Sequence, residues 1–242
     1  MKLTIVGFWG GYPNKDGATS SYLLEKDNFK LVLDLGSGAL SKLQKFVSVP
    51  ELDAVVLSHY HHDHVADIGV LQYAKLIDYY VNNNEKKLKI YGHTEDKEGY
   101  QSLSHQYTEG IAYHPDKVLN IGPFQISFLR TVHPVPCFGM RITDGKKTIV
   151  YTADSSYTEA WIPFARNADV LITDCNYFKG QDGTAAGHMN SEEAARIAQA
   201  ANAGRLVLSH LPQFGVLEQL RKEAKQIYTG PISLAEEGYV WK

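Results

Sequence analysis

Four histidines and an aspartate lie between positions 59 and 64, in the stretch "SHYHHDHVAD". Imidazole and carboxylate groups are suited to binding Zn²⁺, Mn²⁺ or Fe. Alternate side chains of a strand share one face, so His59 and His61 at a strand end point the same way, and His62 points away. Asp63 and His64 follow where the chain must turn, and they can reach a second point close by. This segment therefore predicts ligands for two neighbouring metal ions.

Neither ion is fully coordinated by this segment alone, so further ligands must come from later parts of the chain. His133 follows an apolar strand that ends at Thr131, Asp154 follows "TIVYTA", and His210 follows "RLVLS". In α/β folds, functional sites gather beyond the carboxyl ends of strands. We therefore expect these three residues to complete the metal ligands.

Strands and helices must position these residues, and both are visible in the sequence. Hairpin turns are indicated by Asp27-Asn28 and by Asp144-Gly145. Apolar residues at helical spacing predict a helix over 66–81, and "SEEAARIAQAANAG" predicts a second, with Ser191 as its N-cap. A third helix is expected over 215–226. The strands that we expect cover 3–8, 21–25, 31–33, 55–57, 88–91, 124–131, 140–143, 148–152, 170–173, 205–209 and 238–241.

These elements predict one α/β domain over residues 1–242, with two mixed sheets covered by helices. The composition is that of a globular protein, with 44% hydrophobic and 21% charged residues and a net charge of −3. Extensive nucleic-acid binding by bulk electrostatics is not expected at this charge. The two cysteines form no C-x-x-C pair, and no apolar stretch is long enough to span a bilayer. We expect a cytoplasmic protein without a membrane partner.

The motif S-H-x-H-x-D-H after an apolar strand, followed by isolated His, Asp and His after later strands, resembles the metallo-β-lactamase fold superfamily. The earlier "LDLGSG", which contains Asp34, resembles the D-x-G motif of that superfamily. Within it the chain looks most like the short ribonuclease Z-like hydrolases, on the segments "VGFWGGYP", "ADVLITDCNYF" and "GHMNSEEAARIAQAANAGRLVLSHL". The resemblance spans essentially the whole chain. It implies a four-layer αββα sandwich of two mixed sheets flanked by helices.

The resemblance also implies a dinuclear centre with Zn²⁺, or alternatively Mn²⁺, and a bridging hydroxide that attacks the substrate. Asp34 is expected to orient a ligand or the His59 loop through hydrogen bonds. Asp63 counts among the catalytic residues as well as the ligands. The first metal is matched by His59, His61 and His133, the second by Asp63, His64 and His210, and the bridging carboxylate by Asp154.

His188 matches a histidine that ribonuclease Z-like enzymes place near the leaving group. Asp174 matches the carboxylate partner of that histidine, which would hold its tautomer and raise its pKa. The resemblance therefore implies that His188 is a general acid, which a phosphodiester needs at its departing oxygen. The alternative is a loop or capping histidine without a catalytic role.

Two departures from the ribonuclease Z pattern affect the substrate. Met189-Asn190 replaces the usual Ser-Thr after the histidine, and only a hairpin fits between His133 and Asp154, where that family carries its tRNA-binding arm. We therefore predict a phosphodiesterase for a small or short nucleotide substrate, and we do not expect tRNA to be one. The alternatives are a thioester or lactone hydrolase, similar to glyoxalase II or a lactonase, and a non-catalytic metal-binding protein. A homodimer is among the expected assemblies.

Overall fold

The structure is a computed structural model that describes all residues from Met1 to Lys242. The chain divides into two compact units, which are described separately. The first unit comprises Met1–His114, Ile121–Pro123 and Glu236–Lys242, and the second comprises Pro115–Asn120 and Phe124–Ala235. The predicted single domain over residues 1–242 stays a prediction.

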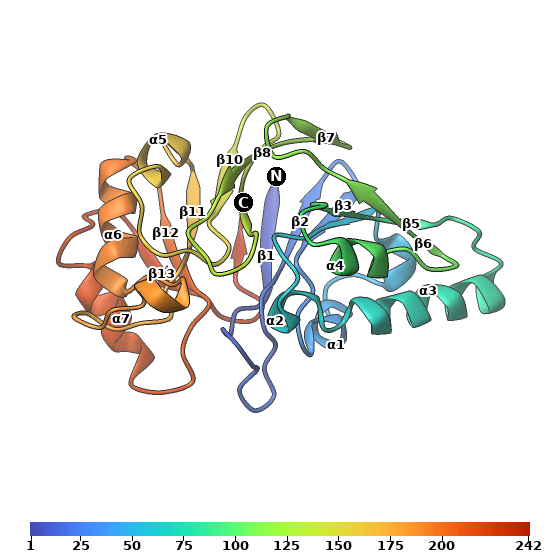
Figure 1. The fold of residues 1–242 in the computed structure, drawn as a ribbon, viewed down its shortest axis with the longest axis horizontal. Helices are drawn as coiled ribbons and strands as arrows, with labels where there is room; N and C mark the ends of the chain where they lie inside the picture. Colours follow the sequence, from blue (N-terminus) through green and yellow to red (C-terminus); the bar gives the residue numbers. More distant parts are fainter. The chain divides into compact units, whose positions relative to one another are not determined.

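The first unit is built on a seven-stranded mixed sheet in the order β14-β1-β2-β3-β4-β5-β6 (Figure 1). From β14 to β3 neighbouring strands are antiparallel, and from β3 to β6 they are parallel. Its strands are β1 (Lys2–Gly7), β2 (Ser21–Lys26), β3 (Phe29–Leu33), β4 (Ala54–Val56), β5 (Leu88–Gly92), β6 (Thr108–Ala112) and β14 (Val240–Trp241). Its α-helices are α1 (Ala39–Leu43), α2 (His62–Val65), α3 (Ile68–Asn82) and α4 (Lys97–Ser102), with a 3-10 turn at Val49–Glu51.

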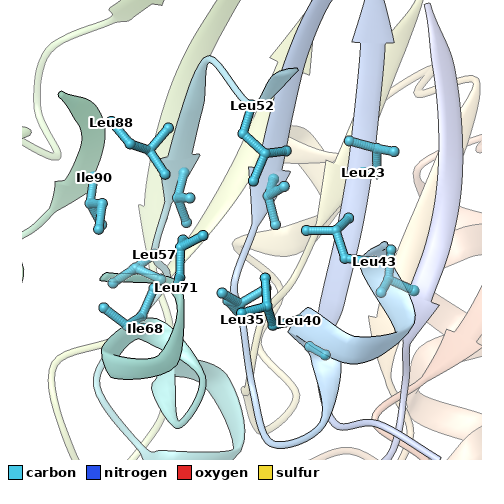
Figure 2. Close-up of a cluster of buried hydrophobic side chains, with 14 of the residues drawn as sticks. Leu23, Leu35, Leu40, Leu43, Leu52, Leu57, Ile68, Leu71, Leu88 and Ile90 are labelled. Atoms are coloured by element: carbon cyan, nitrogen blue, oxygen red, sulfur yellow. The ribbon is translucent and has the colours of Figure 1, made fainter. Parts of the chain in front are cut away.

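Buried leucines and isoleucines join this sheet to α1 and α3 (Figure 2). Leu23 and Leu88 come from strands, Leu40 from α1, and Ile68 and Leu71 from α3. Burying each such side chain contributes about 1.5–3 kcal/mol. This packing holds the segment between β4 and α3, which carries the histidine motif, against the sheet.

The second unit is also built on a mixed sheet, in the order β13-β12-β11-β10-β9-β8-β7. Strands β8, β9 and β10 are antiparallel neighbours, and β10 to β13 are parallel neighbours. Its strands are β7 (Leu119–Ile121), β8 (Phe124–Arg130), β9 (Phe138–Thr143), β10 (Thr148–Tyr151), β11 (Val170–Asp174), β12 (Leu206–Ser209) and β13 (Ile232–Leu234). Its α-helices are α5 (Trp161–Phe164), α6 (Ser191–Ala200) and α7 (Leu217–Ala224), with a 3-10 turn at Thr184–Ala186.

The predicted α/β class, with two mixed sheets and helices packed on them, is confirmed. All of the expected strands and helices are present, with ends that differ by a few residues. Asp27 and Asn28 take left-handed φ values of 50° and 66°, as the predicted tight hairpin turn requires. A membrane-spanning helix is not found, because every helix is too short or too polar to cross a bilayer.

Three strands, four short helices and one helix cap differ from the sequence-based expectation; the unexpected helices are α1, α2, α4 and α5, which are only four to six residues long. Strands β6, β7 and β13 were not expected, because each is short and half-exposed and carries no clear alternation of apolar residues. Helix α6 is capped by Asn190, whose side chain accepts hydrogen bonds from the amides of Glu192 and Glu193. Ser191 is therefore the first helical residue and not the N-cap.

Candidate metal centre

The histidine motif folds into a compact group of side chains in the first unit, which we call the first cluster (His59, His61, Asp63 and His64). It begins just after β4, and its turn is the one-turn helix α2. The His59 ring lies 4.8 Å from the His61 ring and 4.2 Å from the His64 ring, between centroids. His59 and His64 are fully buried, whereas His62 is exposed. The predicted convergence of these four residues is therefore found, with His62 outside the group.

Asp34 orients two histidines of the first cluster through hydrogen bonds. Its carboxylate accepts from the Ser58 amide at 2.7 Å, from the Ser58 hydroxyl at 2.8 Å and from His64 Nδ1 at 2.8 Å. Since Ser58 gives its only hydroxyl proton to Asp34, its oxygen accepts from His59 Nδ1, 3.0 Å away. Both imidazoles therefore carry their proton on Nδ1 and present the Nε2 lone pair, as metal-binding histidines do.

Asp63 stands next to one of these lone pairs. Its Oδ2 atom lies 3.5 Å from His64 Nε2 and accepts a hydrogen bond from the Gly11 amide at 2.7 Å. Two electron-rich atoms at this distance suit two ligands of one cation. A Cβ atom on Gly36 would lie 2.0 Å from the Asp63 carbonyl, so only glycine fits there. Sequence reasoning did not assign roles to Gly11 or Gly36, although "GG" and "GSG" were the available signals.

A second group of side chains, which we call the second cluster, lies in the second unit near the ends of its strands. It consists of His133, Asp154, Asp174, His188 and His210. His210 Nε2 lies 3.3 Å and His133 Nε2 lies 4.0 Å from Asp154 Oδ2. His210 has a left-handed φ of 52°, and so has Ala153 beside Asp154. For a residue other than Gly, Asn or Asp this conformation costs about 1–2 kcal/mol, and outside turns such strain is often stored at functional sites. The predicted approach of His133, Asp154 and His210 is therefore present.

His133 is oriented in the same way as the histidines of the first cluster. Its Nδ1 donates to the Gly187 carbonyl at 3.2 Å. Nε2 is therefore unprotonated, and its lone pair faces Asp154. Gly187 has a left-handed φ of 81°, and a Cβ there would lie 2.4 Å from His133 Nδ1. A glycine is therefore required beside His133, and sequence reasoning did not identify it.

His188 and Asp174 form the predicted pair. His188 Nδ1 lies 2.7 Å from Asp174 Oδ2, and Asp174 is almost fully buried. Burial alone would lower the pKa of His188, but the charge of Asp174 and the hydrogen bond to it outweigh burial, so this pKa is raised. Donor atoms of Asp154, Asp174, His188 and His210 all lie within 4.8 Å of one another. His188 Nε2 is therefore placed to hold a proton or to bind a cation.

The residues present fit divalent metal ions on their own chemistry. Three histidines, His59, His64 and His133, present Nε2 because Nδ1 is committed to a hydrogen bond. Carboxylates lie next to imidazole nitrogens in both clusters, at Asp63 and at Asp154. Mixed imidazole and carboxylate donors suit Zn²⁺ and Mn²⁺.

Comparisons with known proteins agree with this geometry. A profile of the "Beta-lactamase superfamily domain" matches residues 32–211. The chain belongs to the β-lactamase superfamily. It is 54% identical to "Probable metallo-hydrolase YhfI" of Bacillus subtilis, over 100% of both chains. The crystal structure of YhfI superimposes with a TM-score of 0.98, covering 99% of this chain and 98% of YhfI. The predicted metallo-β-lactamase fold is thus confirmed, and the chain is a member of the metallo-hydrolases of this fold.

Two more distant proteins also align with nearly the whole chain. A ribonuclease Z of Sulfolobus acidocaldarius is 26% identical over 94% of this chain and 94% of its own length. The structure of a diphosphatase from the PhnP family aligns with a TM-score of 0.79 at 15% identity, covering 100% of this chain and 97% of the diphosphatase. The second similarity shows the fold alone. The resemblance to ribonuclease Z-like hydrolases within this superfamily is confirmed.

Proposed function

We propose that this protein is a dinuclear metal-dependent phosphodiesterase. The two clusters together are proposed to hold two divalent ions, Zn²⁺ first and Mn²⁺ as the alternative. When bound, such ions lower the pKa of water and make a nucleophile available at neutral pH. The proposal is supported by the orientation of the imidazoles, which keeps Nε2 available for a cation. The residues that would hold the ions are His59, His61, Asp63, His64, His133, Asp154 and His210, and Asp154 would be the carboxylate shared by both ions.

The contact between His188 and Asp174 is the observation that favours phosphodiester hydrolysis over the other hydrolase reactions. A phosphodiester releases an alkoxide, which needs a proton as the bond to phosphorus breaks. Asp174 accepts from His188 Nδ1, so the second proton of the imidazolium is on Nε2, the atom that can donate to the leaving oxygen. Thioesters depend less on such a donor, because a thiolate is a good leaving group. We therefore propose His188 as general acid and Asp174 as its positioning residue.

The proposed substrate is a small or short nucleotide phosphodiester. The chain between His133 and Asp154 forms only the hairpin of β9 and β10. This segment is too short to include a tRNA-binding arm as well. The net charge of −3 gives no bulk attraction to a long polyanion. Among the relatives, a ribonuclease and a diphosphatase carry names that denote cleavage of phosphate bonds. We retain the cytoplasmic location as a prediction. The two cysteines, Cys137 and Cys175, are buried and form no disulfide.

The test compares two diesters that differ in their leaving group. Bis-p-nitrophenyl phosphate releases p-nitrophenolate, which needs little protonation, whereas a dinucleotide releases a ribose alkoxide, which needs it strongly. We expect the metal-loaded protein to hydrolyse both diesters. In His188→Ala, kcat for the dinucleotide should fall by about a hundredfold or more, and kcat for the p-nitrophenyl ester should fall much less. Asp174→Asn should show the same trend in milder form.

Metal content distinguishes a general acid from a ligand. Elemental analysis should give two ions per chain for the wild type and for His188→Ala. His62→Ala is the matched control, because His62 is an exposed histidine outside the cluster, and its activity should equal that of the wild type. A stoichiometry of one ion or fewer at saturating metal would overturn the dinuclear centre. Equal losses on both diesters, or loss of metal in His188→Ala, would overturn the general acid.

A further inference from the structure

A hollow of about 310 Å³ lies next to His133 in the second unit. One wall is the segment 132–134, which follows β8, and the other is the 3-10 turn Thr184–Ala186 together with Gly187. Sites for small molecules usually have volumes of about 300–1,000 Å³, so this hollow can take one small organic group. Of the metal-holding residues proposed above, only His133 lines it.

Hydrogen bonds hold the two walls together, so the hollow is a fixed part of the fold. Ser156 bridges them, since its amide donates to the Val132 carbonyl at 2.9 Å and its hydroxyl donates to the Thr184 carbonyl at 3.0 Å. A second link is the hydrogen bond from His133 Nδ1 to the Gly187 carbonyl at 3.2 Å. A hollow that is already formed requires little ordering of side chains and loops when a ligand binds.

The lining of the hollow is mostly apolar. Val132, Pro134 and Ala185 contribute methyl groups and ring carbons, and no lysine, arginine or carboxylate is among the six lining residues. The Thr184 hydroxyl is already hydrogen-bonded to Asp182, and the Thr184 amide donates to the same carboxylate at 2.9 Å. A phosphate or a polyol in the hollow would therefore find few partners for its oxygen atoms. An uncharged flat ring suits these walls, because apolar walls with few polar groups are typical of sites for such ligands.

The hollow adjoins the proposed general acid. Gly187 in its lining directly precedes His188, and the ring centroids of His133 and His188 lie 5.5 Å apart in a T-shaped arrangement. In the proposed reaction, His188 gives its proton to the oxygen that leaves phosphorus. The organic group on that oxygen is attached by one bond, so it must lie close to His188, where the hollow provides the space.

We propose that this hollow binds the nucleoside that departs when the phosphodiester is cleaved. The inference rests on the proposed function and specifies its substrate further. The apolar walls contact the base of one nucleoside, and the lining holds no cation for a second phosphate beyond it. The preferred substrate is therefore a diester with a single nucleoside as its leaving group, and a longer chain on that side gains no further contact in the hollow.

Two diesters of the same nucleotide test the hollow by kinetics. The leaving group is a nucleoside in the dinucleotide and methanol in the methyl ester, so both release alkoxides but only the nucleoside fills the hollow. The wild-type KM for the dinucleotide should be at least about tenfold lower than the KM for the methyl ester. Ala185→Trp should raise the dinucleotide KM by at least about tenfold, because the indole occupies the hollow. Ala186→Trp is the matched control, since Ala186 is exposed in the same turn but outside the lining, and its KM should equal that of the wild type.

Binding of adenosine alone tests the hollow without any reaction. Ligand-observed NMR on the full chain should detect adenosine binding to the wild type and to Ala186→Trp. In Ala185→Trp the Kd for adenosine should rise by at least about tenfold. Glycerol should not displace adenosine, because the lining offers few partners for hydroxyl groups.

The two measurements distinguish failure of this inference from failure of the proposed function. If diesters are hydrolysed but Ala185→Trp has the same dinucleotide KM and adenosine Kd as Ala186→Trp, the inference is wrong and the proposed function stands. Equal wild-type KM values for the dinucleotide and the methyl ester, or displacement of adenosine by glycerol, would also overturn the inference. If adenosine binds as expected but no diester is hydrolysed, the nucleoside site is supported and the phosphodiesterase is wrong.

Discussion

Asp34→Asn should weaken metal binding although Asp34 is not a proposed ligand. The Ser58 amide cannot reverse its direction, so the single amide oxygen of asparagine must stay where Oδ1 accepts from it. The asparagine NH2 group then faces the Ser58 hydroxyl and His64 Nδ1, which both donate to Oδ2 in the wild type. Ser58 can rotate its proton away, whereas His64 must move its proton to Nε2. The proposed metal-binding lone pair of His64 is then lost.

The expected size of the effect follows from these hydrogen bonds. Loss of a partner that orients a metal-binding histidine typically reduces metal affinity by about 10–100-fold. The free energy of unfolding of the metal-free protein should also fall, by about 1–3 kcal/mol, because a buried donor loses its acceptor. Ser58→Ala should give a smaller loss of affinity, since it removes the acceptor of His59 Nδ1 and leaves Asp34 in contact with His64.

Competition with a chromogenic Zn²⁺ chelator measures the affinity, and urea unfolding in excess chelator measures the stability. Asp53→Asn is the matched control, because Asp53 also accepts from a backbone amide, that of Lys30 at 3.0 Å, but lies outside both clusters. Its metal affinity should equal that of the wild type. If Asp34→Asn bound two ions as tightly as the wild type, the assignment of the His64 tautomer and of Nε2 as a ligand atom would be wrong.

Two further changes probe the second unit. Gly187→Ala should reduce Zn²⁺ affinity at least about tenfold in the same competition assay, because the alanine Cβ would lie 2.4 Å from His133 Nδ1. An unchanged affinity would contradict the proposed orientation of His133. Burial would raise the pKa of Glu223, but hydrogen bonds from the Ser191 hydroxyl and the Lys179 amide outweigh it, so the folded-state pKa is lowered from 4.5. Ionised Glu223 therefore stabilises the folded protein above about pH 4.5, and this contribution is lost as the pH falls through the folded-state pKa. Urea unfolding should show that Glu223→Gln lowers the free energy of unfolding by about 1–2 kcal/mol at pH 7. The free energy of unfolding of this variant should also depend less on pH between about 3 and 5. If the variant had the same pH dependence as the wild type, this reasoning would be refuted.

The sequence by itself determined the proposed ligands and the architecture around them. His59, His61, Asp63 and His64 are adjacent in the chain, so their approach depends on one strand end and one turn. Apolar runs and turn residues likewise predict most strands, since burial and left-handed turns impose strong local requirements on residue type. Even the pairing of His188 with Asp174 follows from motifs that resemble those of known hydrolases.

Contacts between distant residues decided the rest. The proton positions on His59 and His64 depend on Asp34, which approaches them only in the folded sheet. The need for glycine at position 187 depends on the position of His133, 54 residues away. Both faces of α3 carry apolar residues, so its sequence alone could not show which face is buried. In the structure Lys75 and Asp78 are buried as an ion pair, which a protein interior accepts because each charge has its partner, so the opposite face with Val70, Tyr73 and Ile77 is exposed.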